Sequence, residues 1–241
     1  MSKLLYGGNV TANSIRLHYL RYGGHGHPLV LIPGITSPAI TWGFVAEKLA
    51  EYFDVYVLDV RGRGLSSSGD HHQYDTETCV EDILAFVAQL GLAEYYLVGH
   101  SMGARFAIRC AAQQPQGLKK IVLIDPPVSG PNRRAYPSQL PWYVDSIQQS
   151  IDGMDAEDMK KFCPTWTVEQ RQLRAEWLHT CYLPAIIKAF NDFHDIDIHQ
   201  YISKISVPTL LMVAGKGGVI LTYDIDEIQK LNSNISVSHV E

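Results

Sequence analysis

Residues 99–103 read Gly-His-Ser-Met-Gly, a G-x-S-x-G sequence. A short apolar run at 95–98, typical of a buried strand, precedes this stretch, and residues 104–108 after it have helical character. A strand, a tight turn with a central serine and then a helix form a nucleophile elbow, in which the serine hydroxyl stands clear of the sheet edge. The two glycines allow the backbone to turn where a Cβ atom would clash. We therefore interpret Ser101 as a nucleophile, against the alternative of a glycine-rich turn with a solvated serine.

Apolar runs on either side of the elbow alternate between strand and helix patterns. Strands are predicted at 9–11 and 15–22 as a hairpin, then at 28–32, 54–60, 95–98, 118–124, 209–214 and 235–240, with helices at 42–52, 76–90, 104 onward and 224–231. Alternation of this kind indicates a mostly parallel sheet with helices on both faces, the α/β class. Thr76 is the predicted N-cap of the helix at 76–90.

The alternation stops between residues 126 and 203. This segment has no convincing strand and contains helical stretches that are rich in aromatic residues and separated by prolines. We interpret it as a helical cap inserted after the sixth strand, while residues 1–125 and 204–241 form the core. Most of its aromatic side chains should pack between cap and core, and a minority should line a pocket at that interface.

The composition excludes several classes of protein. The 241 residues are 46% apolar and 19% charged with a formal net charge of −5, which gives no electrostatic case for binding nucleic acid or an anionic membrane. No apolar run approaches the ~18 residues of a membrane span, and no secretory signal opens the chain. The four widely spaced cysteines favour free thiols in a reducing cytoplasm. We expect a cytoplasmic protein with a small-molecule substrate and neither metal nor cofactor.

A serine nucleophile needs a base, and the base needs an acid that orients it. One possible acid position follows the strand at 209–214, but residues 215–220 contain no carboxylate. The other follows the strand at 118–124, where Asp125 lies at the carboxyl edge, next to the elbow strand. We therefore assign the acid to Asp125. Its alternative role is that of a turn-forming residue before a proline.

Backbone N–H groups beside the elbow are the expected oxyanion donors. These are the N–H of Met102, which follows the nucleophile, and that of Ile35, in the loop after the strand at 28–32. A second marked motif, residues 59–66, contains Arg61 and Arg63. We interpret it mainly as a structural loop in which Arg61 pairs locally.

No histidine follows the last predicted strand, although the base is expected there. His100 is adjacent to Ser101 in the sequence, so its side chain leaves the turn in another direction. His239 lies within the last strand rather than after it. We therefore expect the base histidine beyond Glu241.

Three motifs, taken in order, resemble the α/β-hydrolase superfamily. They are Pro-Gly-Ile at 33–35, Asp-Val-Arg-Gly-Arg-Gly at 59–64 and the elbow at 99–103, and the resemblance runs from about residue 9 to 241. Segments 33–42, 125–131, 140–145 and 175–182 are similar to deformylases of bacterial nicotinic acid degradation. In these relatives the acid follows the strand after the elbow helix, in agreement with Asp125, and the base lies just past the last strand.

This resemblance implies a cofactor-free serine hydrolase that cleaves a small N-formyl amide acid and releases formate. An esterase or a carbon–carbon bond hydrolase on the same scaffold is an alternative. A ligand-binding relative that kept the pocket and lost the base is another, because the fold alone does not decide among them.

The substrate's carboxylate needs a partner, because burying an unpaired charge is costly. The elbow and the oxyanion loop serve the scissile carbonyl, so the cap should supply the donors. The candidates are Arg133, Arg134, Tyr143, Trp177 and His179, with the two arginines first because a guanidinium can bind a carboxylate through two hydrogen bonds.

Overall fold

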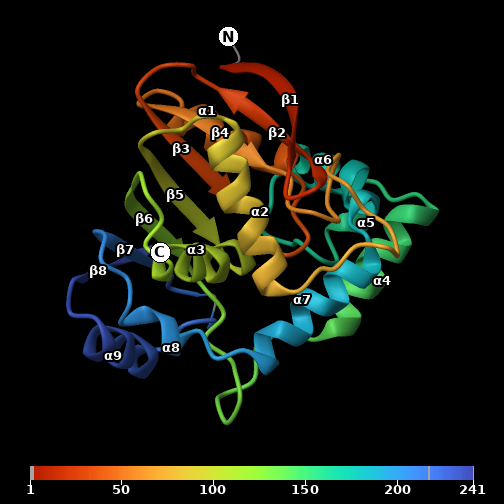
Figure 1. Ribbon diagram of the computed structural model, residues 1–241. Coiled ribbons are helices and arrows are strands. Elements are labelled where there is room, and N and C mark those ends of the chain that lie inside the picture. The colour runs from red at the N-terminus through yellow and green to blue at the C-terminus, as the bar shows by residue number, and fades with distance from the viewer. Residues whose placement is uncertain (1–2, 217, 241) are drawn as a thin grey trace.

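Figure 1 shows the computed structural model of the protein, which describes residues 3–216 and 218–240. The strands are β1 (Leu4–Ala12), β2 (Ile15–Tyr22), β3 (His27–Ile32), β4 (Phe53–Leu58), β5 (Tyr95–His100), β6 (Leu118–Ile124), β7 (Thr209–Ala214) and β8 (Ile235–Val240). The helices are η1 (Ala39–Trp42), α1 (Gly43–Leu49), α2 (Thr76–Gln89), α3 (Met102–Ala112), α4 (Leu140–Asp152), α5 (Ala156–Met159), α6 (Val168–Trp177), η2 (Leu178–Thr180), α7 (Leu183–Asp195), α8 (His199–Ile202) and α9 (Thr222–Leu231). None of these helices is both long and apolar enough to cross a membrane.

Within the described residues, eight strands form one sheet in the order β1-β2-β4-β3-β5-β6-β7-β8. The β1–β2 and β2–β4 pairs are antiparallel, and all later neighbours are parallel. This confirms the predicted mostly parallel sheet. Because β3, β5, β6 and β7 run in the same direction, the loops that follow them meet at one edge, where ligand sites form in sheets of this kind.

Apolar side chains of the central strands alternate between the two faces of the sheet. Leu29 and Leu31 pack in one core cluster with Ala46 of α1, whereas Val30 and Ile32 belong to the cluster that includes α2 and α3. A strand that is covered on both faces is apolar at every position. The uninterrupted apolar run in β3 therefore has a direct structural cause.

The segment between β6 and β7 contains helices and no strand, and Figure 1 shows α4, α5, α6 and α7 gathered beside the strand ends. One buried side chain of the core, Arg105 in α3, holds both ends of this segment. It donates to the carbonyls of Pro127 and Ser129 at one end and to those of Asp192 and Ile196 at the other. Burial lowers the pKa of Arg105 to about 10, so the guanidinium still carries its charge at neutral pH.

The start of helix α2 differs from the prediction. Its N-cap is Asp75, whose carboxylate accepts a hydrogen bond of 3.0 Å from the Thr78 N–H. Thr76, the predicted cap, instead donates its N–H and its hydroxyl to Asp192 of α7, at 2.9 and 2.8 Å. The cap prediction was wrong because the approach of α7 is a tertiary contact that local sequence does not reveal.

Arg61 is paired, as predicted, but with residues outside its own loop, 12 and 21 positions along the chain. Its guanidinium donates to both carboxylate oxygens of Asp82 in α2 and to the carbonyl of Gln73. Arg61 is 4% exposed and Asp82 is 1% exposed. Each charge therefore depends on the other, because neither is solvated.

We predict that Arg61→Met lowers the free energy of unfolding by about 3–5 kcal/mol, because it leaves the Asp82 carboxylate buried without its charge partner. Urea denaturation measures this. The double variant Arg61→Met, Asp82→Leu should recover most of the loss, since it removes both charges. Equal losses in the single and double variants would show that the charge pair is not the cause.

Candidate active site

Ser101 occupies a strained turn between β5 and α3. Its φ is 51° and its ψ is −115°, a left-handed conformation that is unusual for a residue with a side chain. Its N–H donates to the carbonyl of Ile124 in the neighbouring strand β6, at 2.8 Å. Strain of this kind persists only where the surroundings impose it, and it concentrates at functional sites. The structure therefore contains the strand–turn–helix arrangement that the sequence predicts.

The glycines around Ser101 allow the helix to start directly against the sheet. A Cβ atom on Gly103 would lie 2.0 Å from the carbonyl oxygen of Ile32 in β3. A Cβ atom on Gly99 would lie 2.3 Å from the carbonyl oxygen of Gly103 itself. Only glycine fits at either position, and the close contact brings the N-terminus of α3 to the strand edge.

Two backbone N–H groups beside Ser101 are free to bind an oxyanion. Met102 is the first residue of α3, where a helix leaves its N–H groups without internal acceptors. Within the described residues, the N–H of Ile35 also has no hydrogen-bond partner. The loop that contains Ile35 is held by arginines: Arg63 donates to the Ile35 carbonyl at 3.1 Å, and Arg174 donates to the Thr36 carbonyl at 2.8 Å.

Asp125 follows β6 and therefore lies one strand away from Ser101. Its φ is 49°, a second left-handed residue with a side chain at the same edge. Its N–H donates to the carbonyl of Met212 in β7 at 2.9 Å, and its carboxylate accepts from the Ala214 N–H at 3.4 Å. Burial raises the pKa of Asp125, and the Ala214 hydrogen bond opposes that shift.

A cavity of about 510 Å³ opens over Ser101 between the core and the helices that follow β6. The core supplies Gly34, Ile35, Thr36, Ser37, His100 and Ser101, and the segment after β6 supplies Tyr136, Trp142, Tyr143, Phe162, Cys163, Pro164, Thr165, Trp166 and Arg174. The wall is aromatic on the cap side and polar on the loop side. This combination suits a small substrate with one apolar and one polar face.

A family model for the alpha/beta hydrolase fold matches residues 27–240. The chain belongs to the α/β-hydrolase family. It is 66% identical over 241 residues to N-formylmaleamate deformylase of Pseudomonas putida, an alignment that covers all of this chain and 90% of that protein. The crystal structure of N-formylmaleamic acid deformylase from Pseudomonas putida superposes with a TM-score of 0.94 at 49% identity, covering 97% of this chain and 92% of that one.

A more distant solved structure shares the fold of this α/β-hydrolase. It is that of E-2-(acetamidomethylene)succinate hydrolase, with a TM-score of 0.78 at 19% identity, covering 98% of this chain and 91% of that one. At this identity the likeness concerns the architecture alone.

No histidine within the described residues is hydrogen-bonded to Ser101 or Asp125. Two buried histidines pair elsewhere, His18 with Asp59 and His199 with Asp197. The expected histidine base falls outside the described residues and stays a prediction. His100 lines the cavity, and its buried Nδ1 has no partner.

Tyr143 is the one predicted substrate-binding residue among those that line the cavity in the described part of the chain. Trp177 ends α6 and is half-buried, with its carbonyl bound to the hydroxyl of Thr180 at 2.6 Å. His179 is exposed.

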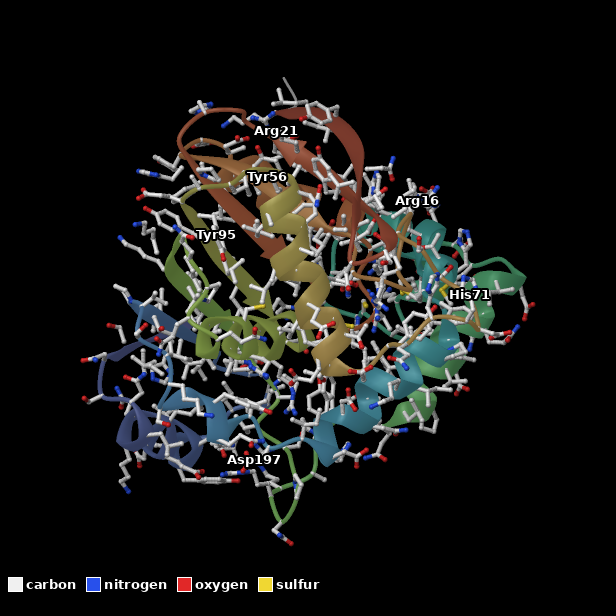
Figure 2. All side chains as sticks on the ribbon, viewed as in Figure 1. Arg16, Arg21, Tyr56, His71, Tyr95 and Asp197 are labelled. Atoms are coloured by element: carbon white, nitrogen blue, oxygen red, sulfur yellow. The ribbon has the colours of Figure 1, made fainter. Side chains whose placement is uncertain are left out.

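Arg133 and Arg134 are bound to acidic side chains. Arg133 binds Asp197 at 3.0 Å and both carboxylate oxygens of Glu227 in α9, and Arg134 binds Asp224 at 3.0 Å. Asp197, the acidic partner of Arg133, lies just before α8, and Figure 2 shows it in the lower part of the molecule, far from Arg16 and His71. Neither arginine is among the described residues that line the cavity.

Among the cavity residues that the sequence analysis did not assign to the site are Tyr136, His100 and Arg174. Burial raises the pKa of Tyr136, while a hydrogen bond with the Ser101 side chain opposes that shift, so the two hydroxyls are neighbours. Tyr136 is separated by only one residue from Arg134, and no local pattern distinguishes the two. His100 was visible as the neighbour of the nucleophile, but its direction depends on the turn.

We predict that Gly103→Ala lowers the free energy of unfolding by about 3 kcal/mol or more, because the new methyl group would overlap the backbone of β3. Thermal or urea unfolding measures the loss. Gly43→Ala is the control: the nearest atom to its Cβ is the Tyr22 hydroxyl at 3.1 Å, and its φ of −52° is helical. A change within about 1 kcal/mol is expected there. Similar losses in both variants would contradict the steric argument.

Proposed function

We propose that this α/β-hydrolase removes the formyl group of N-formylmaleamate, giving maleamate and formate. The observation that carries the proposal is the strained Ser101 at the base of an aromatic cavity, with the free N–H groups of Ile35 and Met102 beside it. The 66% identical relative of that name supports the choice of substrate, because the alignment includes the whole cap.

In the first half of the proposed reaction, the Ser101 hydroxyl oxygen attacks the formyl carbon. The carbonyl oxygen becomes negative, and the N–H groups of Ile35 and Met102 stabilise it. The base takes the serine proton and returns it to the nitrogen of the leaving amide. Maleamate departs, and the formyl group stays on Ser101 as an ester.

In the second half, water attacks that ester and formate leaves. The same base takes a proton from the water and returns one to the Ser101 oxygen, so the enzyme ends as it began. Asp125 would orient the base and stabilise its charged form. The carboxylate is suited to this role because it is half-buried and lies at the same sheet edge as the nucleophile.

The proposed setting is the cytoplasm, with a small-molecule substrate and no cofactor. Cys79, Cys110, Cys163 and Cys181 are all free and buried, which fits a reducing compartment.

We predict that Ser101→Ala lowers kcat for formate release by about three or more orders of magnitude while substrate still binds, because the nucleophile and base act as a unit. Formate is measured by a coupled dehydrogenase assay, and binding by calorimetry. A formate ester serves as a second substrate, since a much faster rate on the ester would favour the esterase alternative. Near-normal turnover by Ser101→Ala would exclude the covalent route.

We predict that Asp125→Asn leaves the unfolding transition intact but lowers kcat by about 10²–10⁴, because the base loses its orienting charge. Asp224→Asn is the matched control: this carboxylate belongs to α9, the helix after β7, and binds Arg134 and the Leu221 N–H. Its kcat should stay within a few-fold of wild type. If Asp224→Asn lost activity and Asp125→Asn kept it, the acid would be Asp224.

A further inference from the structure

The proposed substrate carries a carboxylate close to the scissile bond. Enclosing that charge in an aromatic cavity without a partner is unfavourable by several kcal/mol. The elbow and the oxyanion loop serve the carbonyl group, so a separate group must bind the carboxylate. Arg133 and Arg134 already bind the carboxylates of Asp197, Glu227 and Asp224.

Arg174 of α6 is the one arginine or lysine among the described residues that line the Ser101 cavity. It is 4% exposed, and no carboxylate lies within ion-pair distance of it in the described chain. Its Nη1 and Nη2 donate to the carbonyl and hydroxyl of Thr36, at 2.8 and 2.7 Å. Its Nε is buried and has no partner. The guanidinium also lies over the Trp166 ring, 5.7 Å from its centroid, and beside the Cys163 thiol, but its charge has no carboxylate partner in the described chain and its Nε donor is unused.

His100 is a second unused polar group on the same cavity. Its Nδ1 is buried without a partner, and its ring lies against that of Trp42 with centroids 5.0 Å apart. Burial and then the charge of Arg174 lower the pKa of His100 to about 4, so the imidazole is neutral at neutral pH. A neutral imidazole beside a guanidinium can donate an N–H to an anion without adding repulsion.

Buried polar groups without partners are rare in native proteins and call for an explanation. A bound carboxylate supplies what both groups lack. It accepts hydrogen bonds from the guanidinium and the imidazole, and it neutralises the charge of Arg174. The aromatic wall formed by Trp142 and Trp166 would then enclose the carbon chain of the substrate.

We propose that Arg174 and His100 form the subsite that binds the carboxylate of the N-formyl amide acid. This inference rests on the proposed function for the identity of the acid. Arg174 also holds Thr36, the neighbour of the oxyanion donor Ile35. Binding of the carboxylate therefore fixes the loop that stabilises the reacting carbonyl, and a substrate without this charge loses both effects.

The test compares binding of an acid with binding of its neutral methyl ester. The protein carries Ser101→Ala so that nothing is turned over, and calorimetry or tryptophan fluorescence gives the dissociation constants of N-formylmaleamate and the ester. We expect Arg174→Gln to weaken binding of the acid by about 10- to 100-fold, as for a charged hydrogen bond, and that of the ester by less than about threefold. His100→Phe, which keeps a ring against Trp42, should weaken the acid by about 5- to 10-fold.

Arg171→Gln is the matched control. Arg171 lies on the same helix, is 6% exposed and also has an unpartnered Nε, but it binds Glu157 and the carbonyl of Trp166 and is not among the described cavity residues. The ratio of the acid and ester affinities should stay unchanged in this variant, because a shift of the Trp166 backbone would affect both ligands alike. Arg174→Lys, which keeps the charge but not the paired donors, provides a second variant if Arg174→Gln does not fold, and it should lose part of the affinity for the acid.

Equal weakening of acid and ester by Arg174→Gln would overturn the subsite and leave Arg174 as a support of the loop alone. Unchanged affinity for the acid would overturn it as well. Binding of the product maleamate and of its methyl ester is measured as well, so that failure of the subsite can be distinguished from failure of the proposed function. If the wild-type protein released no formate but bound maleamate through Arg174, the proposed function would fail and the subsite would stand.

Discussion

Two buried arginines hold the backbone on which the candidate site depends. Arg63, 1% exposed, donates to the carbonyl of Ile35, and Arg174 donates to that of Thr36. With these carbonyls bound, the loop after β3 keeps the Ile35 N–H beside the elbow. One arginine comes from the core and the other from α6, so the loop is correctly placed only when both layers are assembled. Burial lowers the pKa of Arg63, which shows how costly its charge is in this position.

Much of the fold, and the centre of the site, could be predicted from sequence because they depend on local rules. A five-residue turn with glycines at both ends specifies the elbow, and unbroken apolar runs mark strands that are buried on both faces. Asp125 could be placed beside the elbow because adjacent parallel strands end at the same edge, so position along the chain translates into position in space. Its role as the acid stays a prediction. The family match and the sheet order confirm that reading of the architecture.

The cap residues could not be placed in the same way, because their neighbours come from distant parts of the chain. Arg133, Arg134 and Arg174 are the same residue type within the segment between β6 and β7. The first two lie in the loop before α4, opposite acidic side chains, whereas the third lies in α6 and lines the cavity. Charge and position in the sequence do not distinguish them. The three arginines differ in whether a carboxylate lies beside the guanidinium in the folded protein.

Arg105 has a consequence for how such proteins diversify. One guanidinium binds the carbonyls of Pro127 and Ser129 where the inserted segment leaves the core and those of Asp192 and Ile196 near its return. The core therefore meets the insertion as a closed loop whose ends are fixed side by side. Because the entropy cost of closing a loop rises only slowly with its length, residues between these anchors can be gained, lost or exchanged at little cost to the core. One core can then carry caps of different size, and with them different substrates.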